Sequence, residues 1–198
     1  GATSGGEAGG GVPRVRWSPD GSRLAHFEGW SVVVRDPVSL EEMTRLRQQE
    51  GNAQPRDFAW SPDGKQILVG WSEGGKSLQT IHDVLTGEVA QALEIPVPYG
   101  AGRESVEWLP DGRTVVIGAN LVDLESKTVL GGLNQFHEWS EDGKLLLASN
   151  DPSFPVVYRF DQRRAKAQPV LEIVGSASPV NSLPVWSPDG SYIKVSGE

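Results

Sequence analysis

Five copies of one short motif constrain this chain more than any other feature of its sequence. The pentapeptide WSPDG occurs three times, and two variants, WLPDG and WSEDG, lie between the second and third copies. The five copies occupy residues 17–21, 60–64, 108–112, 139–143 and 186–190. Their tryptophans follow one another at spacings of 43, 48, 31 and 47 residues. Repeats of roughly 40–50 residues indicate a fold assembled from similar structural units.

The residues around each copy predict strands. A short extended run precedes the motif, as in RVRW, DFAW and SVEW, and an apolar run such as KQILVGW or RTVVIGA follows it. Both runs have the length of strands, are rich in β-branched and aromatic residues, and are bounded by turn residues. The segment Ser39–Glu50 is the nearest to a helical pattern, but a single pair, Met43 and Leu46, is weak support for a helix. We therefore expect an all-β chain.

Each pentapeptide has the composition of a tight β-hairpin turn. Serine can bond to the backbone at the first position, proline fixes φ at the second, and glycine supplies the positive φ that returns the chain. The tryptophan ends the preceding strand, where alternation places it on one face with the residue two before it. We predict that the five tryptophans are structural anchors that pack one unit on the next, rather than an aromatic ligand site. They are Trp17, Trp60, Trp108, Trp139 and Trp186.

A third and a fourth strand complete each full repeat. In four repeats an apolar run leads into an aspartate, which is followed by a turn and another strand-like run. These aspartates are Asp36, Asp83, Asp123 and Asp161. Four antiparallel strands per repeat predict the blades of a β-propeller, four of them full and a fifth that stops after its second strand. Because the third repeat is short, we expect its outer strand to be short as well.

The predicted domain organisation follows the repeats. Residues 1–12 form a glycine-rich stretch, which we interpret as a flexible linker, and residues 13–198 form the propeller. The blades are expected at about residues 13–50, 55–97, 103–132, 134–175 and, as a partial blade, 181–198. The chain has no initiator methionine. We interpret it as a piece of a longer protein, and its repeats as a fragment of a larger propeller.

The second repeat resembles a WD-repeat blade. Residues Phe58–Leu93 run FAWSPDGKQILVGW…SLQTIHDVLTGEVAQAL, with His82 where that family usually has its tryptophan. The WSPDG turns also resemble the repeats of TolB-type propellers and of the propellers attached to prolyl-oligopeptidase-type peptidases. The resemblance extends from about Arg14 to Ser196. It implies the propeller fold, but a fold by itself says little about function.

Composition excludes several classes of partner. The chain has 18 basic and 26 acidic residues and a formal charge of -8. An acidic surface repels phosphate backbones, so we expect no nucleic-acid partner. No apolar run approaches the ~20 residues of a membrane span. The chain has no cysteine, which excludes thiol chemistry. We expect a soluble chain, and its compartment stays open between the cytoplasm and the periplasm or another extracytoplasmic space.

The sequence shows no catalytic constellation. The histidines His26, His82 and His137 are far apart and form no HxH or HExxH motif. We expect His82 to pack in the core, and for His137, at an otherwise apolar position, we favour a core role over a functional one. The turn serines lie outside any GxSxG elbow, and the turn aspartates are not spaced like a calcium loop. We therefore expect no enzyme, no cofactor and no metal site.

The loops contain the better candidates for binding. In the families that the chain resembles, one face carries the loops between second and third strands and those between blades, and this face usually takes partners. Its aromatic and arginine residues here are Trp30, Arg56, Tyr99, Arg103 and Phe154. Such residues are common interface anchors, and local packing on the blade rim is the alternative. We expect a non-catalytic scaffold for a protein or peptide; the alternative is an accessory propeller gating a larger enzyme such as a serine peptidase.

The fifth repeat predicts an open sheet edge. It ends in SYIKVSGE, and the glycine-rich start of the chain is unsuited to supply a missing strand. Unpaired strand edges recruit other chains, so we expect residues 192–196 to pair with further sequence, a partner chain or a second copy. Lys194 supports this, because the other four second strands carry an apolar residue at the same position. A compact five-bladed ring is the alternative.

Overall fold

The described part of the chain consists of β-strands joined by turns. The computed structural model describes residues 15–48, 51–94, 106–118, 120–132, 135–139, 145–151, 154–161, 166–172, 185–186 and 193–194, and from residue 132 onward it describes strand backbones. Two compact units divide the chain, unit 1 at Gly1–Glu94 and unit 2 at Ile95–Glu198. Every regular element in the described ranges is a strand, and these ranges hold no helix able to cross a membrane.

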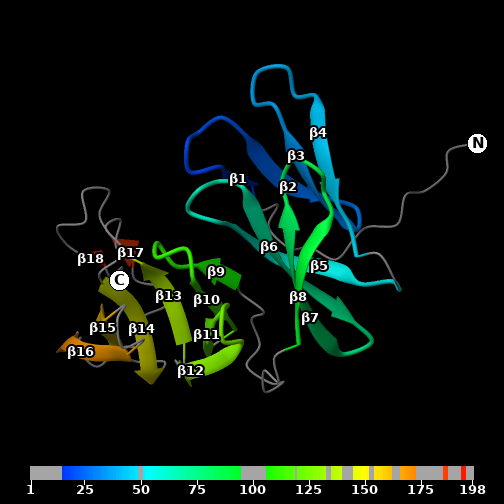
Figure 1. Ribbon diagram of the computed structural model, residues 1–198. Coiled ribbons are helices and arrows are strands. Elements are labelled where there is room, and N and C mark those ends of the chain that lie inside the picture. The colour runs from blue at the N-terminus through cyan, green and yellow to red at the C-terminus, as the bar shows by residue number, and fades with distance from the viewer. Residues whose placement is uncertain are drawn as a thin grey trace, which may run out of the picture. The chain divides into compact units, whose positions relative to one another are not determined.

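Unit 1 contains two four-stranded antiparallel sheets, each with its strands in chain order (Figure 1). The first sheet, blade 1, consists of β1 (Val15–Trp17), β2 (Leu24–Glu28), β3 (Ser31–Arg35) and β4 (Glu42–Leu46). The second sheet, blade 2, consists of β5 (Gln54–Trp60), β6 (Gln66–Glu73), β7 (Lys76–Asp83) and β8 (Val89–Leu93). This order confirms the predicted four-stranded repeat.

Unit 2 repeats the arrangement. Blade 3 consists of β9 (Val106–Trp108), β10 (Thr114–Ile117), β11 (Asn120–Asp123) and β12 (Thr128–Gly132). Blade 4 consists of β13 (Gln135–Trp139), β14 (Leu145–Asp151), β15 (Phe154–Asp161) and β16 (Lys166–Glu172). The strands β17 (Val185–Trp186) and β18 (Ile193–Lys194) form a two-stranded sheet. Four full repeats and a partial fifth are therefore confirmed. The open edge predicted at residues 192–196 stays a prediction, because only residues 193 and 194 of it are described.

Blade 3 is shortened in a different place from the predicted one. Its outer strand β12 has 5 residues, as do β4 and β8, so the expectation of a short outer strand is wrong. The middle strands β10 and β11 have 4 residues each, whereas β2 and β3 have 5 and β6 and β7 have 8. Paired strands shorten together, because a residue removed from one leaves its partner without its ladder hydrogen bonds.

The pentapeptides form the turns that their residues predict. In the second copy the amide of Gly64 donates to the carbonyl of Ser61 at 2.9 Å, and Gly64 has a φ of 67°. The hydroxyl of Ser61 donates to Asp63 at 2.7 Å and accepts from the amide of Gln66 at 2.9 Å. The first copy forms the same bonds around Ser18. Positive φ is the conformation that favours glycine, so the motif encodes this turn directly.

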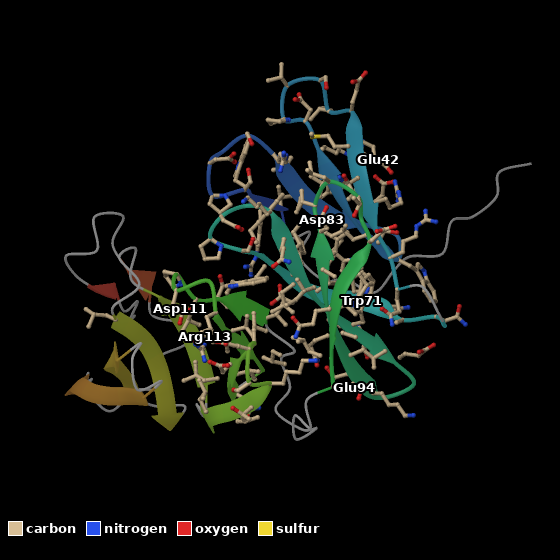
Figure 2. The ribbon with its side chains drawn as sticks, in the orientation of Figure 1. Glu42, Trp71, Asp83, Glu94, Asp111 and Arg113 are labelled. Atoms are coloured by element: carbon tan, nitrogen blue, oxygen red, sulfur yellow. The ribbon has the colours of Figure 1, made fainter. Side chains whose placement is uncertain are left out.

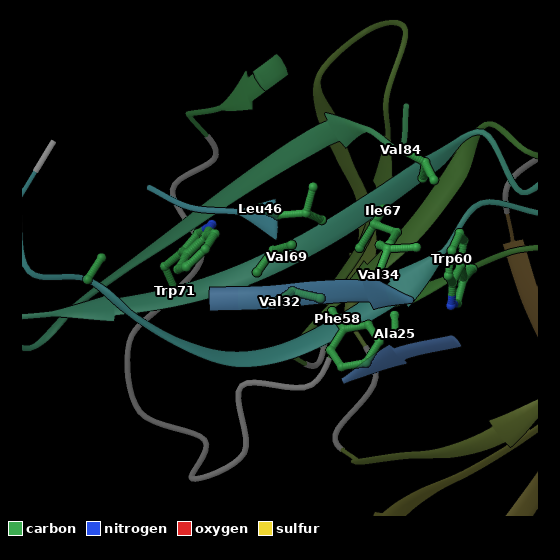
Figure 3. Packing of buried hydrophobic residues seen from close by; sticks show 11 residues of the cluster. Ala25, Val32, Val34, Leu46, Phe58, Trp60, Ile67, Val69, Trp71 and Val84 are labelled. Carbon is green, nitrogen blue, oxygen red and sulfur yellow. The ribbon is translucent and has the colours of Figure 1, made fainter. Parts of the chain in front are cut away.

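A hydrophobic core joins blades 1 and 2 (Figure 3). Blade 1 contributes Ala25, Val32, Val34 and Leu46. Blade 2 contributes Phe58, Trp60, Ile67, Val69, Trp71 and Val84. The rings of Phe27 and Phe58 meet edge to face, with their centroids 5.2 Å apart. Unit 1 is therefore a pair of sheets packed face to face, the arrangement expected of neighbouring blades.

The tryptophans of the five motifs differ in their burial. Trp60 and Trp108 are 8% and 6% exposed, as anchors should be, whereas Trp17 is 58% exposed. The indole Nε1 of Trp60 donates to the carbonyl of Arg16, in blade 1, at 3.2 Å. Trp17 does not pack in this way, because blade 2 lies against the opposite face of blade 1. The other two, Trp139 and Trp186, end β13 and β17, and their side chains lie outside the described residues.

Candidate functional site

Two of the five predicted loop residues are described with their side chains. Trp30 lies in the turn between β2 and β3 and is 52% exposed. Arg56 is exposed and lies at a bulge in β5, where it stands outside the regular pairing with β6. Tyr99 and Arg103 lie outside the described residues. Phe154 begins β15, and its side chain lies outside them as well. The described part of the site therefore belongs to unit 1.

Trp30 and Arg56 lie at corresponding ends of their blades. Because Val32 of β3 pairs with Leu46 of β4, the end of β4 lies beside the turn that carries Trp30. In blade 2, Gln54 at the start of β5 pairs with Ser72 near the β6–β7 turn. Residues 47–53 connect these two ends. We call this end of unit 1 the loop face. Its described residues are 29–30, 47–48, 51–56 and 73–76.

Glu73 holds the connection between the blades in place on the loop face. Its carboxylate accepts a hydrogen bond from the amide of Asn52 at 2.6 Å. It also lies so close to Gly51 that a Cβ there would meet its Oε1 at 2.2 Å, and Gly51 has a φ of 85°. The β6–β7 turn and the connection are thus joined by a charged hydrogen bond that requires glycine at position 51.

A second arginine, which the sequence prediction missed, lies on the loop face. Arg47 directly follows β4, and its Nε donates to the Oγ of Ser31 at 3.3 Å. Because Ser31 is the neighbour of Trp30, this bond holds the arginine beside the turn with the exposed indole. The available signal was the position of Arg47 at the start of a connection between blades.

The arginines of unit 1 fall into two groups. Arg35 and Arg45 both bind the carboxylate of Glu28 at 2.6 Å. Hydrogen bonds from Arg45 first, and then from Arg35, lower the pKa of Glu28 to about 2. Within the described residues, by contrast, neither Arg47 nor Arg56 forms an ion pair. The loop face therefore presents two exposed guanidinium groups without acidic partners, in a chain whose formal charge is -8.

His82 is a core residue, as predicted. Its side chain is fully buried, with Nε2 2.8 Å from the Oγ1 of Thr80 and Nδ1 3.1 Å from the carbonyl of Gly87. The carbonyl of Gly87 can only accept, so the neutral ring carries its hydrogen on Nδ1, and Nε2 accepts from the hydroxyl of Thr80, which itself accepts from the indole of Trp71 at 2.7 Å. Burial lowers the pKa of His82, which keeps the ring neutral.

The described histidines lie away from the loop face, whose described side chains include an indole and two guanidinium groups. His26 is bonded within blade 1, where its Nε2 accepts from the Nε of Arg35 at 3.0 Å, and the side chain of His137 lies outside the described residues. In the part of the chain that the structure describes, no three acidic or histidine side chains gather as metal ligands would. An indole and two guanidinium groups bind anions and apolar surface, and a guanidinium stays protonated throughout the physiological pH range.

Solved structures resemble the chain, although no protein-family model and no curated protein sequence matches it. Hydrazine synthase of Kuenenia stuttgartiensis is 21% identical with a TM-score of 0.63, over 96% of this chain and 58% of that chain. The β-propeller domain of Cps50 (Swd1) from Myceliophteria thermophila is 14% identical with a TM-score of 0.55, over 92% of this chain and 78% of that chain. The C-terminal WD40 domain of Sif2 is 19% identical with a TM-score of 0.62, over 89% of this chain and 52% of that chain.

These likenesses concern the fold and not the activity. The identities are 14–21%, and unrelated functions share folds at such distances. The chain spans 58% of the length of the hydrazine synthase chain and 52% of that of the Sif2 chain. Two of the three structures are WD40 or β-propeller domains, and the described sheets have the four-stranded antiparallel order of such blades. The chain therefore has an all-β, WD-repeat-like β-propeller fold.

Proposed function

We propose that this chain is a non-catalytic propeller scaffold whose loop face binds a protein or peptide partner. The observation that carries the proposal is the combination of the exposed indole of Trp30 with two unpaired arginines, Arg47 and Arg56, at corresponding ends of adjacent blades. Tryptophan and arginine are frequent anchors of protein interfaces, because one buries a large rigid surface and the other makes several directed hydrogen bonds.

The charges indicate an acidic segment in the partner. A guanidinium group binds a carboxylate through two parallel hydrogen bonds, and Arg47 and Arg56 have no such ligand among the described residues. The bonds from Arg47 to Ser31 and from Asn52 to Glu73 link the elements of this face to one another without a partner. Such preorganisation lowers the entropy lost when a partner docks.

We propose no catalytic step on this face. The described histidines are bonded within the sheets, and arginine does not exchange protons at neutral pH. The alternative function, an accessory propeller that gates a larger enzyme, stays a prediction, as does the resemblance to TolB-type propellers. No described residue argues for either.

Photo-crosslinking from the loop face tests the proposal. The chain would carry p-benzoylphenylalanine at position 30 or, as a matched control, at position 17, which is another exposed tryptophan of blade 1. We expect a partner protein to be captured from position 30 and not from position 17. That partner should bind the Trp30→Ala and Arg56→Glu variants about tenfold more weakly or worse. Lys65→Glu, a charge reversal at a WSPDG turn, should leave its affinity unchanged. Equal capture from both positions, or unchanged affinity of the loop-face variants, would refute the proposal.

A further inference from the structure

The β3–β4 turn and the first residues of β4 carry exposed apolar residues. Val38, Leu40 and Met43 are 92%, 58% and 48% exposed. Single exposed apolar residues are ordinary on protein surfaces, but three so close together in one hairpin call for an explanation. We call residues 36–43 the blade 1 tip. It lies at the end of β3 opposite Trp30, so it is separate from the loop face.

The backbone of Leu40 is the second unusual feature of the blade 1 tip. Its φ is 59°, a region that disfavours residues with a side chain, because the Cβ approaches a backbone oxygen. The position four residues after the turn aspartate is Gly87 in blade 2, with a φ of 75°, and Lys127 in blade 3, with a φ of 56°. Blade 2 thus has glycine, the residue that this conformation favours.

The turn itself does not need a leucine. The carboxylate of Asp36 accepts from the amides of Val38 and Ser39 at 2.9 and 2.8 Å, and the amide of Leu40 donates to the carbonyl of Asp36 at 2.9 Å. Blade 2 closes the same turn around Asp83 with the same three bonds and a glycine. The turn takes a positive φ here in all three blades, and blade 1 differs in placing an exposed leucine at this position.

Acidic residues alternate with the apolar residues of the tip along the chain. Asp36, Glu41 and Glu42 lie within the same hairpin, and Figure 2 shows Glu42 where β4 begins. Glu42 is paired with Arg45, whereas Glu41 is exposed and forms no ion pair within the described residues. Arg35 donates to the carbonyl of Leu40 at 2.9 Å, and its charge is engaged by Glu28 of the same blade. The blade 1 tip is therefore an apolar knob with a negative rim.

We infer that the blade 1 tip is a docking site for a protein segment that is apolar and rich in lysine or arginine. The apolar part would bury Val38 and Leu40, and the basic side chains would match the acidic rim. An anionic membrane surface is disfavoured, because its headgroups repel the same rim. The corresponding turn of blade 2 has one exposed apolar residue there, Leu85, and a glycine in place of the leucine, so it supplies an internal control.

Selection from a peptide library on the whole chain tests this inference. A random library displayed on phage would be depleted on the double variant Val38→Ser/Leu40→Gly and then selected on the unaltered chain. We expect enriched peptides that combine Leu, Phe or Trp with Lys or Arg. They should bind the unaltered chain about tenfold more tightly than the variant, and more weakly as salt is added. Failure to enrich such peptides, or equal binding to the variant, would overturn the inference.

Further variants separate docking from folding and from the loop face. Leu40→Gly alone relieves the backbone, so it should raise the Tm while it weakens the selected peptides; a lowered Tm would mean a structural role and overturn the inference. Leu85→Ser and Trp30→Ala should leave peptide affinity unchanged, and a loss in either would move the site away from the tip. Vesicles of phosphatidylcholine with phosphatidylserine should not bind the chain. Binding to vesicles that is lost in the double variant would assign the tip to membranes and refute the protein partner.

Discussion

Blades 1 and 2 contain the same pentapeptide and place its tryptophan in opposite environments. The turn bonds are the same in both copies, yet Trp17 is 58% exposed and Trp60 is 8% exposed. Trp60 packs on blade 1, where its indole donates to the carbonyl of Arg16 at 3.2 Å. Trp17 shares a face with Leu24, away from the face that packs against blade 2. The pentapeptide therefore specifies a turn, whereas the burial of its tryptophan depends on a neighbouring sheet.

The other side chains on these two faces also differ between blades 1 and 2. Corresponding positions hold Trp71, Thr80 and His82 in blade 2 and Glu28, Val33 and Arg35 in blade 1. In blade 2 they form a buried chain of hydrogen bonds between neutral groups. In blade 1 the carboxylate of Glu28 is 43% exposed and binds two arginines. Neutral groups that are hydrogen-bonded can be buried under another sheet at little cost, whereas ion pairs are better placed on a face that is in contact with water.

Removing each tryptophan in turn should give the largest difference between the blades. Trp60→Ala leaves a cavity in the core shared by both blades and should lower the free energy of unfolding by about 3–5 kcal/mol. Trp17→Ala removes a side chain that is already half in water and should cost less than about 1 kcal/mol. Denaturant unfolding of both variants measures the two values. Similar losses would show that Trp17 is buried in solution as well.

The buried histidine should make the stability of blade 2 depend on pH. Because burial lowers the pKa of His82 below its ordinary 6.5, the unfolded chain takes up a proton at this position more readily than the folded chain. The contribution of neutral His82 is fully present above pH 6.5 and is lost progressively as the pH falls below 6.5 toward the lower pKa of the folded chain. His82→Gln should cost about 2–3 kcal/mol at pH 7, since the carbonyl of Gly87 and the hydroxyl of Thr80 lose their partner.

Unfolding curves at several pH values check both parts of this expectation. The free energy of unfolding of the unaltered chain should fall between pH 7 and 5, and the His82→Gln variant should show a smaller fall. Equal slopes in the two proteins would mean that His82 does not titrate differently on folding.

The turn glycine of blade 2 should tolerate no side chain, although the equivalent position of blade 1 holds a leucine. A Cβ on Gly87 would lie 3.0 Å from the Cγ2 of Thr44 and 3.1 Å from the carbonyl oxygen of Arg45, at a φ of 75°. Gly87→Ala should therefore destabilise the chain by about 1–2 kcal/mol. Thermal unfolding measures the change. An unchanged Tm would show that blade 1 moves away from this turn at no cost.

The reverse substitution should give the smallest effect and the opposite sign. Leu40→Gly removes the strain of a leucine at a φ of 59°, while it adds chain entropy to the unfolded state. We expect a net gain of about 0.5–1 kcal/mol, measured by the same unfolding experiment. A loss of stability would mean that the leucine side chain packs usefully in the fold.

Turns and strands could be predicted from the sequence because they depend on near neighbours. The positive φ of Gly64 and the shared face of Phe58 and Trp60 follow from the local pattern alone. The length of the strands in blade 3 could not be predicted, since β10 and β11 set each other's length by pairing. The exposure of Trp17 could not be predicted either, because it depends on which face of blade 1 meets blade 2.

The candidate site was predictable to a smaller extent. The exposure of Trp30 follows from its place in a tight turn. The parts played by Arg47 and Glu73 come from bonds to Ser31 and Asn52, which the folded sheets bring together from distant positions. A sequence pattern shows which residues lie in loops, but it does not show which loop residues hold one another.

Solvent access of individual tryptophans tests the central comparison most directly. All seven tryptophans would be replaced by 5-fluorotryptophan, and the fluorine signals of positions 17 and 60 assigned with the Trp17→Phe and Trp60→Phe variants. A soluble gadolinium chelate would then be added, since it speeds the relaxation of exposed nuclei. We predict strong relaxation of the signal from Trp17 and little change in that from Trp60. Equal protection of both signals would contradict the account, because it would mean that identical pentapeptides have identical surroundings in both blades.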